Sequence, residues 1–138
     1  RYLASQHGLT GADAFEAAWV DALADQFKDY MGEFRNYWYV FMGYRKGDKD
    51  ALFKEFGETS RDKFYPLLQK QLQASKSGFL VGDKVTWVDF LIAEHVATVQ
   101  VEIPGFLDKY PEVEAHAAKV RALPAIAAWI EKRPVTRG

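Results

Sequence analysis

Two polar side chains at the edge of an apolar run are the first candidates for chemistry. In residues 80–90, LVGDKVTWVDF, Thr86 and Asp89 stand three positions apart. A hydroxyl beside a carboxylate could form half of a nucleophilic site, but a catalytic threonine needs a base such as histidine or an N-terminal amine. No histidine lies within eight residues of Thr86, the nearest being His95. The pattern therefore favours a structural role.

The same two residues match the start of a helix. In a capping box, Thr86 accepts the amide of Asp89 while the Asp89 carboxylate accepts the amide of Thr86. Val85 and Phe90 flank the box and predict a hydrophobic staple, and the helix dipole favours an acid in the first turn. We predict that Thr86 and Asp89 form a structural cap, and that replacing either with alanine costs about 1 kcal/mol or somewhat more and slows folding.

Acids and histidines supply the remaining candidates. Three acids recur at every fourth position along one predicted helical edge: Asp21, Asp25 and Asp29. Such a row fits either a solvated stripe or a binding surface. His95 follows Glu94 without an HExxH motif or a second histidine at ligand spacing, so we predict a packed or pocket-lining side chain rather than a metal ligand. His7 and His116 are predicted to lie on the surface.

Composition limits the classes of function. The chain has 138 residues, of which 49% are hydrophobic and 27% charged, typical of one globular domain. Its net charge of −1 and its lack of long basic runs argue against nucleic-acid binding. It has no cysteine, which excludes disulfides and thiolate metal sites, no apolar stretch of membrane-spanning length, and no GK[ST] phosphate loop.

Hydrophobic residues recur at helical spacing and predict an all-α bundle of about five helices. A first helix is expected from about Asp13 to Tyr44, and a second from about Lys49 to Ser77 with a kink or interruption around Thr59–Pro66, because Pro66 lacks a backbone donor. The first helix would bury Phe15, Trp19, Leu23, Phe27, Met31, Phe34, Trp38 and Phe41. The second would bury Leu52, Phe53, Phe56, Phe64, Leu67, Leu68 and Leu72.

The second half of the chain predicts three shorter helices. One begins near Thr86, is apolar on most sides and should therefore be central. Others run from Pro111 to about Ala122 and onward from Pro124, both prolines suiting a first helical turn. The four tryptophans are expected in the core: Trp19, Trp38, Trp87 and Trp129.

The first residues, RYLASQHGL, predict the last two turns of a helix closed by Gly8 in a left-handed C-cap. A helix with an end but no capped beginning suggests that further sequence precedes it.

These motifs resemble one known family. FLVGDKVTWVDF is similar to the capping-box segment in the C-terminal helical domain of glutathione transferases. YPEV and LPAIAAWIEKRP resemble the last two helices and tail of that domain, and AWVDALADQFKDY resembles the opening of its first helix in the sigma-like, nematode type. The resemblance implies that residues 1–11 end the last helix of a missing thioredoxin-like N-terminal domain, and that residues 12–138 form the helical C-terminal domain.

The resemblance also implies roles for particular residues. Asp29 would contact the glutathione of the partner subunit. The electrophile pocket would be lined by Met31, Arg35, Asn36, Leu91, His95 and Gly138. No tyrosine of this chain matches the thiol-activating tyrosine of the family, so no catalytic residue is implied. Some members hold a metal with clustered acids here, but Lys28 replaces the middle acid, and no metal is expected.

The function implied by the resemblance is that of a parent enzyme, a cytoplasmic homodimer that detoxifies electrophiles by adding the glutathione thiolate to them. Prostaglandin isomerisation and peroxide reduction are further activities of the family. This chain would supply the electrophile pocket and a contact across the dimer, and it would be inactive by itself. The alternative is a non-catalytic interaction or structural module of the same fold, as in translation factors or lens crystallins.

Overall fold

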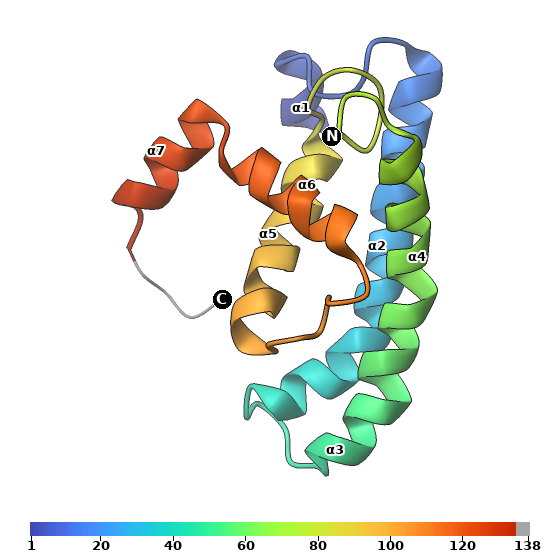
Figure 1. The fold of residues 1–138 in the computed structure, drawn as a ribbon, viewed down its shortest axis with the longest axis vertical. Coiled ribbons are helices and arrows are strands. Elements are labelled where there is room, and N and C mark those ends of the chain that lie inside the picture. The colour runs from blue at the N-terminus through green and yellow to red at the C-terminus, as the bar shows by residue number, and fades with distance from the viewer. Residues whose placement is uncertain (135–138) are drawn as a thin grey trace.

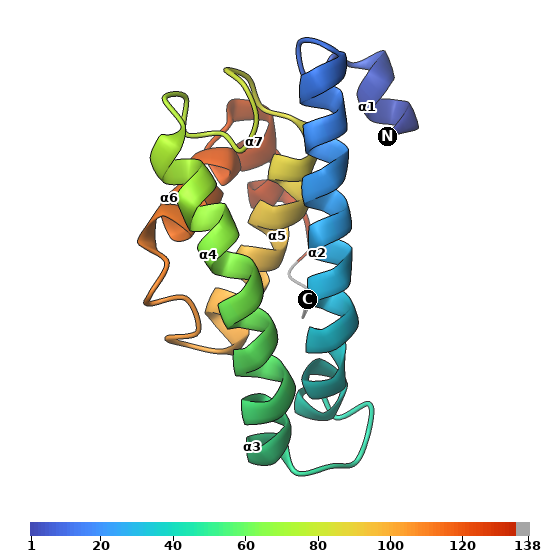
Figure 2. The same ribbon diagram turned by 90° about the vertical axis from the view of Figure 1, so that its right-hand side faces the viewer.

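A computed structural model describes residues 1–134. Its elements follow in chain order: α1 Tyr2–Gln6, α2 Ala14–Phe41, α3 Lys49–Leu52, the π-helical turn η1 Phe53–Glu58, α4 Thr59–Ala74, α5 Trp87–Glu102, α6 Pro111–Arg121 and α7 Pro124–Lys132. The predicted all-α bundle is confirmed. α2 and α4 run side by side in opposite directions, α5 packs beside them, and α6 crosses α5 (Figures 1 and 2).

The first long helix begins where the sequence predicts. The Asp13 side chain caps α2 by accepting the amide of Glu16 at 2.8 Å. The helix ends at Phe41, three residues before the expected end. Its buried face differs from the predicted one, because Phe15 and Trp19 are 79% and 42% exposed. The residues that do bury are Val20, Leu23, Ala24, Phe27, Tyr30, Phe34, Tyr37 and Val40.

The second helical run is interrupted upstream of the predicted position. The π-helical turn covers Phe53–Glu58, and α4 continues through Pro66. Pro66 is exposed, so the carbonyl that lacks its donor can be solvated, and the helix tolerates it. Within the turn, Gly57 lets the Phe53 ring approach, since a Cβ there would lie 2.7 Å from Phe53 Cδ2. Leu67, predicted to be buried, is 52% exposed.

The predicted central helix is confirmed. α5 follows the cap residue Thr86 and contacts both α2 and α6. The backbone amide of Trp87 donates to the carbonyl of Leu9 at 2.9 Å, which ties the start of α5 to the segment after α1. That segment turns at Gly8 with φ +66°, the left-handed conformation expected for a helix end.

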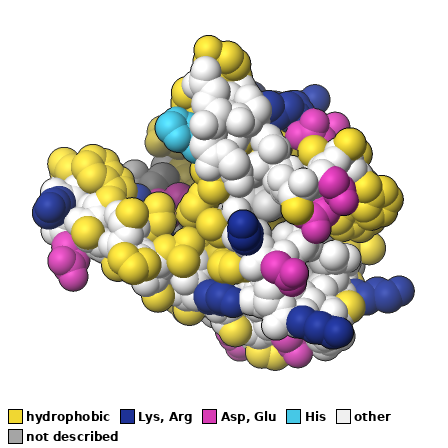
Figure 3. Space-filling model, turned by 90° about the horizontal axis from the view of Figure 1, so that it is seen from above, with side chains coloured by type: hydrophobic (Ala, Val, Ile, Leu, Met, Phe, Trp, Pro, Cys, Tyr) yellow, Lys and Arg dark blue, Asp and Glu magenta, His cyan; other side chains and the backbone are white. Residues whose placement is uncertain are grey.

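The last two helices begin at their predicted prolines, but two expectations about side chains are wrong. His116 is buried on α6, not on the surface, because it shares a face with Val113, Ala117 and Val120. Trp129 is 59% exposed on α7, a helix without a fully buried residue. Seen from above, hydrophobic side chains cover the arm formed by α7 (Figure 3).

Candidate functional site

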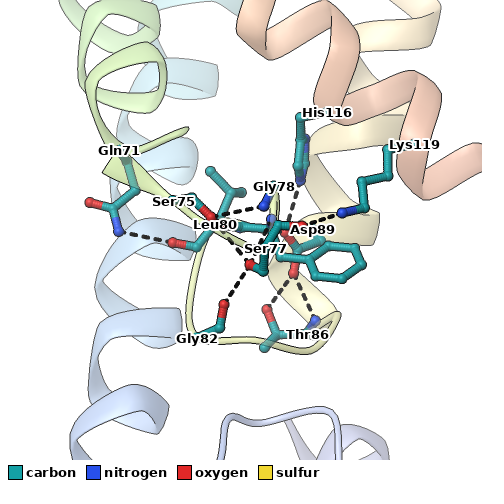
Figure 4. A network of polar contacts seen from close by, with 11 residues as sticks. Gln71, Ser75, Ser77, Gly78, Leu80, Gly82, Thr86, Asp89, His116 and Lys119 are labelled. Atoms are coloured by element: carbon teal, nitrogen blue, oxygen red, sulfur yellow. Dashed lines mark hydrogen bonds and ion pairs between the residues drawn. The ribbon is translucent and has the colours of Figure 1, made fainter. Parts of the chain in front are cut away.

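The first candidate, Thr86 with Asp89, forms a buried hydrogen-bond network at the start of α5 (Figure 4). Asp89 is fully buried, and Thr86 is 2% exposed. Asp89 Oδ2 accepts the Thr86 amide at 2.7 Å and the Thr86 hydroxyl at 2.8 Å. The predicted capping box is thus confirmed. Because its hydroxyl donates to the carboxylate and is shielded from solvent, Thr86 is not placed to act as a nucleophile.

The other carboxylate oxygen of Asp89 ties in two further segments. Oδ1 accepts the backbone amide of Leu80 at 2.9 Å and lies 2.8 Å from Nε2 of the buried His116. Burial by itself would raise the pKa of Asp89, but the hydrogen bonds from His116, Leu80 and Thr86 outweigh it and lower the pKa from its ordinary value. The carboxylate is therefore held ionised and joins α5, α6 and the 75–86 loop.

The 75–86 loop is fastened to the same region by further contacts (Figure 4). The Lys119 ammonium of α6 donates to the carbonyl of Ser77 and lies 4.3 Å from the ring centroid of Phe79. Gln71 of α4 donates to the carbonyl of Leu80 at 2.9 Å. These contacts indicate that the network organises the fold around the start of α5.

A second polar contact joins α2 to α5 further along both helices. Tyr30 Oη lies 3.0 Å from His95 Nε2. Tyr30 is 4% exposed, and the rings of Phe27 and Phe34 pack against His95 edge-on, with centroids 5.2 and 5.8 Å away. His95 as a whole is half-buried, but loss of solvation around its ring lowers its pKa to about 4. His95 is therefore neutral at physiological pH.

Five of the pocket residues implied by the resemblance lie on α2 and α5, the two helices that this contact joins. On α2, Met31 is half-buried and packs against the core, Arg35 is exposed, and Asn36 is half-buried with its amide donating to the carbonyl of Glu33 at 3.1 Å. On α5, Leu91 lies one turn before His95 and is 37% exposed. Gly138 lies outside the described residues. The structure thus places five of the six on neighbouring turns of two packed helices.

Asp29 stands apart from the other acids of its row. Arg1 pairs with Asp21 at 2.7 Å and with Asp25 at 3.4 Å. Within residues 1–134, no ion pair of Asp29 is found, and the side chain is exposed. It borders a depression of about 110 Å³ between α2 and α4 that also reaches Tyr30 and Lys63. This acid is therefore available for a cationic partner.

Sequence reasoning did not single out Tyr30 or assign His116 to the interior. Both signals were present, because Tyr30 lies three residues after Phe27 and four before Phe34, and His116 lies in register with Val113 and Val120. In the described part of the chain, no group of three or more histidine and acidic side chains could hold a metal ion. None of the described helices is long and apolar enough to cross a bilayer.

Comparison with known proteins gives one consistent result. Residues 32–133 match the family described as the glutathione S-transferase C-terminal domain. Probable glutathione S-transferase 5 of Caenorhabditis elegans is 48% identical over 136 residues, which make up 99% of this chain and 65% of that protein. The chain thus spans about two thirds of the length of this relative.

Solved structures agree with this match. Monomeric Na-GST-3 from the hookworm Necator americanus superposes with a TM-score of 0.94 at 40% identity, over 100% of this chain and 67% of that one. A Nu-class glutathione S-transferase from Haemonchus contortus superposes with a TM-score of 0.90 at 44% identity and the same coverage.

Proposed function

The chain belongs to the glutathione S-transferase family, through its C-terminal domain, and on this premise we propose that it forms the electrophile-binding half of a glutathione transferase. The complete enzyme would add the thiolate of glutathione to small hydrophobic electrophiles. Catalysis would rest on a lowered thiol pKa and on holding the two reactants together. The family match over residues 32–133 carries this proposal.

The surface between α2 and α5 supports the proposed pocket. An apolar electrophile that reacts beside a polar tripeptide needs a wall that mixes apolar and polar groups. Met31 and Leu91 would supply apolar contact, whereas Arg35, Asn36 and His95 would supply polar groups. Gly138 stays in the proposal as a residue of the same pocket.

The accessible carboxylate of Asp29 supports the second part of the proposal, a contact with glutathione bound to the partner subunit. Glutathione carries one ammonium group, and an exposed acid without an internal ion pair can bind it without breaking another contact. Asp21 and Asp25, in contrast, already pair with Arg1. Asp29 would hold the tripeptide in place and take no part in activating the thiol.

Thiol activation is assigned to a thioredoxin-like domain that precedes residue 12 in the complete protein, with residues 1–11 ending its last helix. The isolated 138-residue chain would then lack conjugating activity. Glutathione conjugation by this chain at the rate of ordinary transferases would contradict the assignment.

The finer aspects of the function are also proposals. We place the complete enzyme in the cytoplasm, as a detoxifying homodimer of the sigma-like class, although one relative is described as monomeric and another as Nu-class. Sedimentation of the complete protein tests the homodimer. Assays with prostaglandin H2 and cumene hydroperoxide test prostaglandin isomerisation and peroxide reduction.

The proposed function is tested by measuring glutathione affinity and conjugation in the complete protein. Asp29→Ala should weaken glutathione binding about tenfold, because a hydrogen bond to a charged group contributes about 1.5–3 kcal/mol. Asp25→Ala, on the same helical edge, is the matched control and should leave the affinity unchanged. An equal affinity in wild type and Asp29→Ala would remove Asp29 from the site. Absence of both binding and conjugation would favour the non-catalytic module.

A further inference from the structure

The contact between Tyr30 and His95 determines which hydrogen-bonding group His95 can offer to the pocket. A neutral histidine carries its proton on one ring nitrogen, and the partner of the other nitrogen selects the tautomer. In this structure Nε2 lies 3.0 Å from Tyr30 Oη. Either atom could donate at that distance, so the donor has to be identified from the proton affinities of the two groups.

Three properties make Tyr30 the donor. Burial raises the pKa of Tyr30 well above its ordinary value, so the phenol keeps its proton. His95 is neutral, as its lowered pKa shows, so Nε2 has a free lone pair in one of its two tautomers. Imidazole nitrogen is also a much stronger base than a phenolic oxygen, whose lone pairs are delocalised into its ring. The stable arrangement is Tyr30 O–H donating to Nε2.

The consequence lies at the opposite side of the ring. With Nε2 as the acceptor, the proton of His95 must be on Nδ1. Nδ1 has no hydrogen-bond partner within residues 1–134, and it is not among the fully buried side-chain atoms there that lack one. Nδ1 therefore keeps some solvent exposure, whereas three aromatic rings surround the rest of the imidazole.

We propose that Tyr30 is a positioning residue that holds His95 as the Nδ1–H tautomer, so that the pocket wall presents one neutral hydrogen-bond donor to the electrophile. This inference rests on the proposed function for the location of the pocket. With this donor, the pocket should prefer electrophiles in which an oxygen gains negative charge during the reaction.

An α,β-unsaturated aldehyde illustrates the chemistry. The glutathione sulfur forms a bond to the β-carbon, and the carbon–carbon π pair shifts to give an enolate whose charge lies on the carbonyl oxygen. Nδ1–H of His95 donates to that oxygen as the charge develops. The α-carbon then takes a proton from water, and the carbonyl is restored. An alkyl halide such as benzyl chloride develops no charged oxygen and gains nothing from the donor.

The tautomer can be measured directly by recording nitrogen-15 correlation spectra of the histidine side chains in the 138-residue protein. We expect a protonated Nδ1 and an unprotonated Nε2 for His95. His116 provides an internal contrast, because its Nε2 faces the Asp89 carboxylate and must carry a proton. In Tyr30→Phe, a substantial share of His95 should convert to the Nε2–H form. A wild-type His95 protonated on Nε2 would overturn the proposal.

The effect on specificity is measured in the complete enzyme with trans-2-nonenal and benzyl chloride. Tyr30→Phe should lower the ratio of kcat/KM for the aldehyde to that for the chloride severalfold, in proportion to the share of His95 that leaves the Nδ1–H form. Tyr37→Phe, a buried tyrosine on the same helix, is the matched control and should leave the ratio unchanged. In His95→Asn, whose amide can replace Nδ1–H, the ratio should exceed that of His95→Leu.

The two proposals fail in different ways. An equal loss with both electrophiles in Tyr30→Phe would overturn the role of Tyr30 while leaving the transferase function standing. If the complete wild-type protein conjugates neither electrophile, the proposed function fails, and the specificity assigned to His95 fails with it.

Discussion

Two histidines on neighbouring helices, His95 of α5 and His116 of α6, have opposite kinds of partner. His116 is 3% exposed, and its Nε2 lies 2.8 Å from the fully buried carboxylate of Asp89. His95 is half-buried, and its Nε2 lies 3.0 Å from the neutral phenol of Tyr30. An ionised carboxylate can only accept, so His116 must donate, whereas the phenol donates and His95 must accept.

The difference separates a structural region from a candidate binding region. Around Asp89, four donors from the 75–86 loop and α6 converge on one carboxylate, so every one of these polar groups serves the fold. Around His95, one hydrogen bond fixes the ring and leaves the second nitrogen accessible. The charged network of Asp89 should therefore contribute more to the free energy of unfolding than the neutral pair of Tyr30 and His95. That pair instead keeps one nitrogen of His95 for a ligand.

The largest effect is expected from Asp89→Ala. It leaves the donors from Leu80, Thr86 and His116 without an acceptor inside the protein. The loss in the free energy of unfolding should therefore exceed the roughly 1 kcal/mol expected from the capping box alone and reach about 3–5 kcal/mol. Thr86→Ala removes one of these donors and should cost about 1 kcal/mol. Urea denaturation measures both. Asp29→Ala, at an exposed acid, is the control with an expected change within about 0.5 kcal/mol. Equal costs for Asp89→Ala and Thr86→Ala would contradict the network.

The second-largest effect is expected from pH, because His95 and Asp89 should change the free energy of unfolding in different pH ranges. Unfolded His95 binds a proton near pH 6.5, but folded His95 does so only near pH 4. The unfolded state therefore holds more protons in that window, and His95 should lower the free energy of unfolding by at most roughly 3 kcal/mol as the pH falls through it. The pKa of Asp89 is lowered from 3.8, so its contribution is lost only at still lower pH.

Urea denaturation from pH 7 to pH 4 checks this window in wild type and His95→Gln. The glutamine variant does not titrate, so its stability should fall less steeply over the same range. Parallel curves for the two proteins would show that the His95 ring is solvated and would weaken the contrast with Asp89.

A smaller loss is expected from His116→Phe. It removes one of the four hydrogen bonds of Asp89, and a hydrogen bond to a charged group contributes about 1.5–3 kcal/mol, so we expect a loss near about 2 kcal/mol in urea denaturation. His116→Gln can donate from a side-chain amide and should recover part of the loss. If both variants match wild type, His116 does not support the carboxylate.

The smallest effect is expected from Tyr30→Phe, which removes a hydrogen bond between two neutral groups. The loss should be about 1 kcal/mol, measured by the same denaturation. Tyr37→Phe reports the general cost of removing from α2 a tyrosine hydroxyl that makes no hydrogen bond within residues 1–134. A loss in Tyr30→Phe as large as that in Asp89→Ala would reverse the ranking of the two regions.

The sequence predicted features that depend on residues close together in the chain. Thr86 and Asp89 lie three apart, so helical geometry brings them into a capping box whatever the rest of the fold does. Asp13 caps α2 and Gly8 closes α1 for the same local reason. The prediction that Phe15 and Trp19 lie in the core is wrong. Periodicity shows which face of α2 is apolar, but it does not show along how much of that face other helices pack.

The contacts that define the two regions join residues far apart in the chain. Tyr30 and His95 are 65 residues apart, and Asp89 and His116 are 27 apart. Helical periodicity could have placed each side chain on a buried face, as it does for His116 beside Val113 and Val120, but it cannot select the partner. The partner depends on how α2, α5 and α6 cross.

The sequence by itself thus determined the all-α class and the helix starts, since these follow from the spacing of apolar residues and from local capping motifs. It pointed to the family only through the resemblance of its segments to known ones. The tertiary structure decided which histidine faces a carboxylate and which faces a phenol. Side chains of the same type acquire a protonation state only from the donors, acceptors and solvent that packing brings to them. That is why His116 supports the fold, and why we propose the differently partnered His95 as the histidine that meets a ligand.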